Sequence, residues 1–451
     1  MKPVTPLPPG PRGLPLLGSL LDYQKGAADF LLRTRTRYGA DSRIRMGPYV
    51  FTLATSPASV YRVLVENRPN YERGVLYKQF ELVMGRGLLT LDDEDWKPHR
   101  RAIQPAFTKA AVASYYPFIE HQAQSLVERW RQASAEGRPI ELISECLRLA
   151  SAVILEASLG VRASIADDAL RRVVDESIDI MFPHGTLSEQ LPEWLPTPRN
   201  RRVRQNRKRL LNFAQSVLDG HEADRDTIDV ISSIRREHPD LSESELRDEL
   251  LTIYLAGHET TAMGLCWALT MLAQQPGMHA RLSEEAGATA VANVPSMAEL
   301  AGFGYADAFV AETLRLFPPI WVFPRDARED DTLSGYRVQA GTSVLLSPLV
   351  THRDPDVWTN PSAFDPERFL GKQKHPRGAY IPFGLGARQC IGNAMALLEI
   401  KAFLATIARE FRLEVLPTSI NSYGDSLVSL RPLDEVWVKV TPFDAARKVA
   451  V

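Results

Sequence analysis

The sequence predicts a mainly α-helical protein with a minor β part, an α+β fold built as one large domain over residues 1–451. Most segments between residues 92 and 275 carry apolar side chains at helical spacing. Runs rich in β-branched residues lie near both ends, at 43–56 and 324–350, and predict a sheet made from both ends of the chain. No linker-like change of composition divides the sequence, so we expect a single domain.

Composition narrows the class of protein. With 45% hydrophobic and 24% charged residues, the chain is typical of globular proteins. A net charge of -2 argues against a nucleic-acid partner. Three cysteines are too few for a disulfide framework and indicate a reducing compartment, so we expect a cytoplasmic protein. No apolar run reaches about 18 residues, so we expect no transmembrane anchor.

Residues 1–20 predict a proline-rich lead-in. Prolines at positions 3, 6, 8, 9, 11 and 15 exclude the continuous apolar centre of a secretory signal. They favour an extended, stiff segment, which either frays or packs over the surface of the domain. The next predicted element is a hairpin over 43–56, where Gly47-Pro48 marks the turn.

The longest predicted helix opens at Ser242, which forms a capping box with Glu245, and stops before Pro276. At ~1.5 Å per residue, a helix of this length crosses the whole domain. Its apolar run Leu250–Ala256 indicates that part of the helix is buried on all sides.

Poor helix formers follow in the middle of this helix. Gly257 and the pair Thr260-Thr261 predict a break that provides a groove, a close backbone approach or a polar group facing a cavity. The alternative is a tolerated glycine beside a solvent-facing Glu259. A zinc-protease HExxH motif is excluded, because position 262 is alanine.

A glycine-rich loop at 383–392 precedes another predicted helix, over 391–411. Its glycines permit a tight backbone before Cys390, which therefore lies at a helix N-terminus. Free N–H groups there, and the nearby Arg388, are expected to lower the pKa of the thiol and stabilise a thiolate.

Such a thiolate can be a nucleophile, a redox thiol or a metal ligand. No histidine lies nearby to act as a base, and Cys146 and Cys266 stand in apolar helical segments typical of a core. A single-thiolate metal ligand remains, for which haem iron is the main case. A buried inert thiol is the alternative, which the surrounding glycines and arginine argue against.

At this point the sequence resembles the cytochrome P450 family, the haem-thiolate monooxygenases. Five family motifs occur in family order, and the leading PPGP matches the N-terminal hinge of the family. They are W-x-x-x-R at Trp96 and Arg100, [AG]-G-x-[DE]-T-[TS] at Ala256, Gly257, Glu259, Thr260 and Thr261, E-x-x-R at Glu312 and Arg315, P-E-R-F at Pro366–Phe369, and F-x-x-G-x-R-x-C-x-G at Phe383, Gly386, Arg388, Cys390 and Gly392.

The resemblance implies the triangular-prism fold of the family and a haem b cofactor whose iron is bound by Cys390. The amides of Ile391 and Gly392 are expected to donate to the sulfur. The cofactor-binding residues implied are Trp96, Arg100, Arg325, Phe383, Arg388, Cys390 and Gly392, with the tryptophan and the arginines at the haem propionates.

The resemblance also implies roles on the opposite face of the haem. Glu259 and Thr260 would be catalytic and deliver protons to the reacting dioxygen through water, while Gly257 leaves room for oxygen and substrate. Glu312, Arg315 and Arg368 would form a buried structural network.

The implied reaction inserts one oxygen atom into a C–H or C=C bond and needs two electrons from NAD(P)H. No G-x-G-x-x-G precedes a helix, so we expect no reductase domain. Separate partners, a ferredoxin or flavodoxin with its reductase, would dock near Lys97, Arg101 and Lys109, and we expect a monomer. A peroxygenase, an isomerase and a non-enzymatic haem sensor or carrier are the alternatives.

The predicted substrate pocket is lined by 71–90, by 175–195, by the long helix near Ala256 and by Ile320–Phe323. These segments are mostly apolar, which favours a terpenoid, a steroid-like skeleton or a fatty acid. A carboxylate could be bound by Tyr71, Arg73, Tyr77 and Lys78.

Seven basic residues lie between Arg199 and Arg209. This basic segment follows a proline-rich stretch. It predicts a solvated helix face, with contact to a membrane surface as the alternative.

Overall fold

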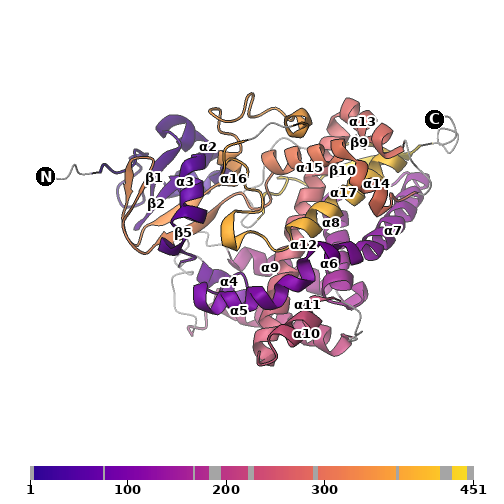
Figure 1. Ribbon diagram of the computed structural model, residues 1–451, viewed down its shortest axis with the longest axis horizontal. Coiled ribbons are helices and arrows are strands. Elements are labelled where there is room, and N and C mark those ends of the chain that lie inside the picture. Colours follow the sequence, from indigo (N-terminus) through magenta and orange to yellow (C-terminus); the bar gives the residue numbers. More distant parts are fainter. Residues whose placement is uncertain are drawn as a thin grey trace.

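The computed structural model describes residues 5–74, 77–165, 168–181, 194–221, 228–287, 293–371, 375–416 and 429–443. Figure 1 shows one group of strands beside the N-terminus and another near the C-terminus, while helices fill the rest of the molecule. The helices are α1 (Leu20–Gln24), α2 (Ala27–Tyr38), α3 (Pro57–Tyr61), α4 (Lys78–Met84), α5 (Asp93–Ile103), α6 (Lys109–Ser114), α7 (Tyr116–Ala135), α8 (Leu142–Val153), α9 (Asp168–Met181), α10 (Pro198–Gly220), α11 (Val230–Glu237), α12 (Glu243–Gln274), α13 (Pro276–Gly287), α14 (Met297–Gly302), α15 (Gly304–Leu316), α16 (Pro348–Thr351) and α17 (Asn393–Glu410).

The strands confirm that both ends of the chain build the β part. They are β1 (Asp41–Met46), β2 (Tyr49–Ala54), β3 (Tyr71–Glu72), β4 (Ile140–Glu141), β5 (Phe323–Ala327), β6 (Asp331–Leu333), β7 (Tyr336–Val338), β8 (Ser343–Leu346), β9 (Phe411–Val415) and β10 (Trp437–Pro442). The largest sheet has the order β1-β2-β8-β5-β3, and a smaller one has the order β4-β10-β9.

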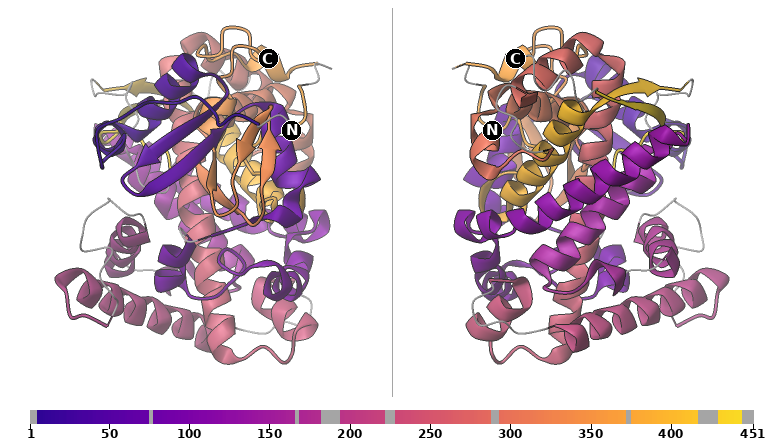
Figure 2. Two further views of the ribbon diagram at one scale, coloured as in Figure 1. Left: turned by 90° about the vertical axis from the view of Figure 1, so that its left-hand side faces the viewer. Right: turned by 90° about the vertical axis from the view of Figure 1, so that its right-hand side faces the viewer.

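The predicted hairpin forms at β1 and β2, and Gly47 in its turn has a φ of 59°. On the other side β2 pairs in parallel with β8, which places Leu53 beside Leu345. These inward-facing residues form a small apolar core under the sheet. Figure 2 shows strands from the two ends of the chain lying side by side.

The lead-in packs over this sheet as a strap. Arg43 N donates to Pro9 O at 2.7 Å, and Arg337 N donates to Pro6 O at 2.8 Å. Gly10 lies so close that a Cβ there would be 1.8 Å from Arg43 O. The packed alternative is therefore confirmed for the described part of the lead-in, while residues 1–4 lie outside the described residues.

Helix α12 runs through the middle of the molecule in both views of Figure 2. The capping box of Ser242 and Glu245 is present, and the helix ends two residues before Pro276. The predicted break is wrong, because helical structure continues through Gly257 and Thr260. The Thr260 hydroxyl donates to Ala256 O at 2.8 Å, which satisfies it within the helix.

The main apolar core joins α7, α8, α12 and α17. Cys146 and Cys266 lie in it with no exposed surface, as predicted for core thiols. Within the described part of the chain, no helix combines the length and apolar character that crossing a bilayer requires.

The predicted network around Glu312 is present and buried. Arg315 donates to both carboxylate oxygens of Glu312, at 2.6 and 2.7 Å, and neither side chain is exposed. Arg368 reaches the same carboxylate at 3.3 Å. Arg315 also donates to the carbonyls of His352 and Pro361, at 2.8 and 2.7 Å. The network therefore ties α15 to the loop that leads toward Cys390.

The basic segment begins helix α10, as predicted. Most of its cations are exposed, which fits a solvated face. Arg199 instead donates to Gln79 at 2.9 Å, and Arg207 pairs with Asp248 at 3.4 Å. These two contacts hold α10 against α4 and α12.

Candidate active site

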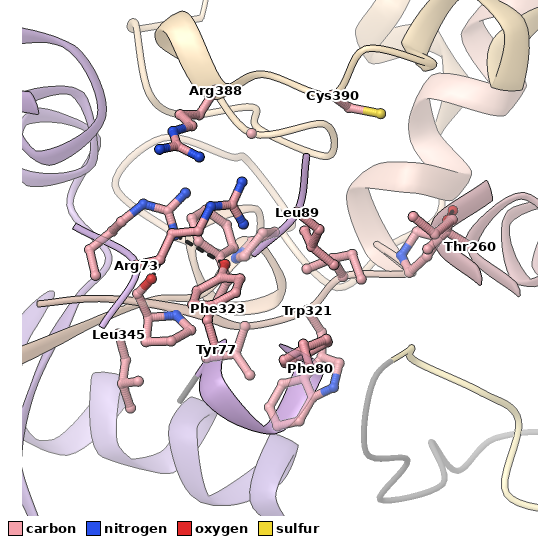
Figure 3. A pocket seen from close by; sticks show the side chains of 18 of the residues that line it. Arg73, Tyr77, Phe80, Leu89, Thr260, Trp321, Phe323, Leu345, Arg388 and Cys390 are labelled. Atoms are coloured by element: carbon pink, nitrogen blue, oxygen red, sulfur yellow. Dashed lines mark hydrogen bonds between the residues drawn. The ribbon is translucent and has the colours of Figure 1, made fainter. Parts of the chain in front are cut away.

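A cavity of about 1280 Å³ lies between the sheet and the helical body. It is lined by α12, by α5, by the loop around Cys390 and by the segment before β5. Figure 3 shows Cys390 and Thr260 on different walls of this cavity, with Trp321, Phe323 and Phe80 also lining it. The predicted segments 71–90 and 320–323 therefore meet at one site. No described residue of the predicted segment 175–195 lines the cavity, and residues 182–193 lie outside the described residues.

The loop before α17 has the tight backbone that its glycines predict. Gly384 and Gly386 have φ angles of 70° and 76°, in the left-handed region. A Cβ on Gly386 would lie 2.4 Å from Leu64 O, so only glycine fits there. Cys390 N donates to Phe383 O at 2.9 Å, which closes the loop and turns the cysteine into the cavity.

The pKa of Cys390 differs from the prediction. Burial raises the pKa of the thiol, and the opposing effects of the Gly392 amide and Arg100 do not outweigh it. Desolvation by the surrounding cavity walls disfavours the thiolate, although the sulfur itself is exposed to the cavity. The Gly392 amide does donate to the sulfur, as expected. A metal cation would have to displace the proton to hold this sulfur as a thiolate.

Three arginines gather on one wall of the cavity, which we call the cation wall: Arg100, Arg325 and Arg388. Arg388 lies over the Trp96 ring, 4.4 Å from its centroid, and Arg100 donates to Gln389 O at 3.1 Å. Arg325 donates to the Tyr77 hydroxyl at 3.1 Å. The structure therefore brings together the four residues predicted to contact the propionates.

Arg73 belongs to the same cation wall, which the sequence analysis missed. It is 7% exposed and lies over the Tyr77 ring at 4.7 Å. Burial lowers the pKa of Arg73 to about 9, and its Nε has no hydrogen-bond partner among the described residues. Arg73 could have been found from the pairing of β3 with β5, because continuing the register of these strands sets Arg73 opposite Arg325.

The other residues considered for a substrate carboxylate are separated. The Tyr71 hydroxyl donates to Asp331 at 2.8 Å and is buried. Arg325 donates to the Tyr77 hydroxyl, and of the four residues only Lys78 is exposed at the cavity. The four residues therefore do not form one carboxylate site.

Glu259 and Thr260 both line the cavity. The Glu259 carboxylate accepts hydrogen bonds from Ser429 Oγ at 2.5 Å and Arg431 Nε at 2.7 Å. It is 2% exposed, so the alternative of a solvent-facing glutamate is wrong. Ser429 and Arg431 were missed, because they are far away in the sequence.

Gly257 lies on the cavity wall, next to Ile154. A Cβ on Gly257 would lie 2.2 Å from Ile154 Cδ1, so the glycine lets the Ile154 side chain, which also lines the cavity, approach closely. Room for oxygen and substrate beside Gly257 stays a prediction.

The residues present fit a haem group. A thiol faces an extended cavity, and buried arginines on the adjoining wall include one with an unpartnered Nε, which suits propionate carboxylates. A single sulfur ligand with open space opposite is the donor set of a haem-thiolate site.

The fold and this site define a haem-thiolate oxygenase class, and comparisons identify the family. The cytochrome P450 family model matches residues 8–434. The chain therefore belongs to the cytochrome P450 family, and it is a haem-dependent monooxygenase.

Named relatives share this family over most of their length. Cyclooctatin synthase of Streptomyces melanosporofaciens is 32% identical over 429 residues, covering 90% of both chains. Cyclooctat-9-en-7-ol 5-monooxygenase of the same species is 30% identical, covering 90% of this chain and 89% of its own. Pentalenene oxygenase of Streptomyces avermitilis is 28% identical, covering 90% and 91%.

A solved structure has the same fold. Retinoic acid bound cyanobacterial CYP120A1 superposes with a TM-score of 0.85 at 24% identity, covering 97% of this chain and all of the other. The predicted fold class, mainly α with a minor β part, is confirmed.

Proposed function

We propose that this monooxygenase hydroxylates or epoxidises a hydrophobic terpenoid, with Cys390 as the haem ligand. The observation that carries the proposal is the Cys390 thiol facing a large cavity whose walls are mostly apolar. Bound haem supplies the iron at which dioxygen is activated.

The apolar walls support an uncharged substrate. Trp321, Phe323, Phe80 and Leu89 line the cavity, and Arg73 and Tyr77 belong to the cation wall. Among the described residues that line the cavity, Lys78 is the one exposed cation, and the arginines there are assigned to the propionates. The names of three relatives refer to cyclooctatin, cyclooctat-9-en-7-ol and pentalenene, which favours a terpenoid.

The chain's own residues hold the cofactor and handle protons. Trp96 and the arginines at 100, 325 and 388 would hold the propionates, joined by Arg73. Phe383 O closes the loop by accepting from Cys390 N, and the Gly392 amide donates to the sulfur. Thr260 places a hydroxyl on the cavity wall, from which it can orient water by leaving its bond to Ala256 O.

Glu259 would act as the proton donor behind Thr260. Its carboxylate is held by Arg431 and Ser429, so delivery of a proton requires the carboxylate to exchange partners. Ser429 and Arg431 hold the Glu259 carboxylate in place, so Arg431 would influence how readily Glu259 supplies a proton.

Electrons would come from an acidic ferredoxin or flavodoxin. Lys97 and Arg101 are exposed on α5, which also carries Trp96 and Arg100, and Lys109 is exposed at the start of α6. A partner on these cations would lie beside the residues that hold the haem.

The test begins with haem-loaded protein, reduced and exposed to carbon monoxide. We expect the absorption of a thiolate-ligated haem in the wild type and in Cys146→Ala, and its loss in Cys390→Ser. A histidine-type spectrum in the wild type, or the thiolate absorption in Cys390→Ser, would end the assignment.

Substrate class is tested by spin-state titration with terpene alcohols, steroids and fatty acids. Terpenes that shift the spectrum should then gain one oxygen atom from labelled dioxygen when a ferredoxin and its reductase are supplied. Spectral shifts with fatty acids alone would contradict the terpenoid proposal. Turnover with peroxide but not with the electron chain would identify a peroxygenase.

A further inference from the structure

A buried acid–base pair links α5 to α12 outside the haem-contacting residues. His99 Nδ1 lies 2.6 Å from Glu249 Oε1. The Glu249 side chain is 1% exposed and that of His99 is 9% exposed. Neither residue belongs to the cation wall or lines the cavity.

The second carboxylate oxygen of Glu249 holds a different segment. Leu88 N donates to Glu249 Oε2 at 3.1 Å. One residue earlier on α12, Asp248 accepts a hydrogen bond from Arg86 N at 2.9 Å. Two adjacent carboxylates therefore hold the backbone of residues 85–91, which we name the wall segment.

Glycines let the wall segment approach α12 closely. A Cβ on Gly85 would lie 2.1 Å from an Asp248 oxygen, and one on Gly87 would lie 2.3 Å from Thr252 Oγ1. The segment is thus pressed against the helix, and its next residues, Leu88 and Leu89, line the cavity.

His99 and Glu249 each hold a proton more tightly than the isolated side chains do. Burial opposes the cation, but the hydrogen bond and charge of Glu249 outweigh it and raise the pKa of His99. Glu245 and Asp95 add negative charge, and the His238 ring lies 5.9 Å away. Burial also raises the pKa of Glu249, so the pair keeps its shared proton to a higher pH than an isolated histidine would.

We infer that Glu249 and His99 are positioning residues for substrate binding. One carboxylate fixes both α5 and the wall segment, so the position of Leu88 and Leu89 against a bound molecule follows the position of α5. This inference rests on the proposed function, because it takes the cavity as the substrate site. It adds a link between the face where a redox partner would dock and the wall that contacts substrate.

The experiment compares two ligands of haem iron that differ in reach. On haem-loaded protein, 4-phenylimidazole extends toward the cavity walls and imidazole does not, and both are followed by the haem absorption shift. We expect Glu249→Gln and His99→Leu to weaken 4-phenylimidazole about five- to tenfold, while imidazole changes by less than about twofold.

A matched variant separates geometry from loss of a side chain. In His99→Asn the amide nitrogen replaces Nδ1 as the donor, so 4-phenylimidazole affinity should stay within about twofold of wild type at neutral pH. Glu94→Gln, an exposed change on the same helix, should alter neither ligand. Unchanged 4-phenylimidazole binding in Glu249→Gln, or equal losses for both ligands, would overturn the inference.

The pH profile decides the matter if His99→Leu fails to fold. As pH rises above about 6.5, the ordinary histidine value, wild-type affinity for 4-phenylimidazole should fall when His99 loses its proton at its raised pKa, and His99→Asn should lack this fall. Equal slopes in the two proteins would exclude the role. The carbon monoxide spectrum distinguishes failure of the proposed function from failure of this inference. If Cys390 is not the haem ligand, the thiolate absorption is missing from every protein, including the wild type.

Discussion

The guanidinium of Arg388 lies over the Trp96 ring at 4.4 Å and donates to Leu91 O at 2.7 Å. These contacts join the loop that presents Cys390 to α5 and to Leu91, two residues before that helix. They therefore tie the position of the sulfur to the position of α5.

Trp96→Leu is expected to weaken haem retention. It removes the ring on which Arg388 lies, a contact of about 0.5–2 kcal/mol, or roughly a 2- to 30-fold faster loss of haem. Transfer of haem to an excess of apomyoglobin measures that rate. Trp96→Phe keeps an aromatic face, so its rate of haem loss should lie between those of the wild type and Trp96→Leu. Equal rates in the Phe and Leu variants would count against the stacking contact.

Thr260→Ala is expected to uncouple electron use from product formation. The variant lacks the hydroxyl on the cavity wall, and losses of about 10²-fold in product per electron pair are typical for a lost proton-transfer group. NAD(P)H consumption, peroxide and oxygenated product are measured together. Thr260→Ser restores the hydroxyl and should restore most of the coupling. Full coupling in the alanine variant would remove the role.

Charge reversal on α5 is expected to slow electron transfer. Lys97→Glu and Arg101→Glu should reduce the rate of haem reduction by an acidic ferredoxin roughly tenfold at low salt, and the difference should shrink as salt rises. Reduction by dithionite should not change. Lys208→Glu, exposed on α10, is the control, and an equal effect there would argue against docking at α5.

Glu312→Gln is expected to destabilise the fold. It leaves Arg315 buried without its carboxylate partner, which costs about 3–5 kcal/mol. Urea unfolding of the haem-loaded protein measures the change. Glu367→Gln removes a surface ion pair with Arg281 and should cost less than about 1 kcal/mol. Similar costs for the two variants would contradict the buried network.

His352 is expected to make stability fall in acid. Burial lowers the pKa of His352 to about 3, and its ring accepts from Ile381 N at 2.8 Å while facing Arg315 O at 3.0 Å. The unfolded chain binds a proton near the ordinary value of about 6.5, so stability is lost as pH falls below that value.

The size of this effect is about 1.4 kcal/mol per pH unit between about pH 6 and about pH 4.5, above the range in which carboxylates dominate. Unfolding curves across this range measure the slope. In His352→Gln the slope should decrease by about one proton. An unchanged slope would show that another group titrates.

Local patterns predicted most of the fold. The capping box at Ser242 and the turn at Gly47 act within a few residues, so sequence alone locates α12 and the hairpin. The glycines before Cys390 predict a tight loop, because the left-handed backbone of such a loop favours glycine at those positions.

Features that depend on distant partners were not predictable. Glu259 is held by Arg431 from the end of the chain, and Arg73 joins Arg325 only through strand pairing. The pKa of Cys390 rises because burial by the whole fold outweighs the helix end. Gly257 meets Ile154, a residue from another helical segment, which its local sequence does not indicate.

The parallel pairing of β2 with β8 sets an order for biosynthesis. β2 is synthesised early and its partner β8 late, so this part of the sheet can form only after most of the chain has left the ribosome. Cys390 emerges later still. Haem held by that thiol would therefore be captured late in folding, after every strand of this sheet has been made.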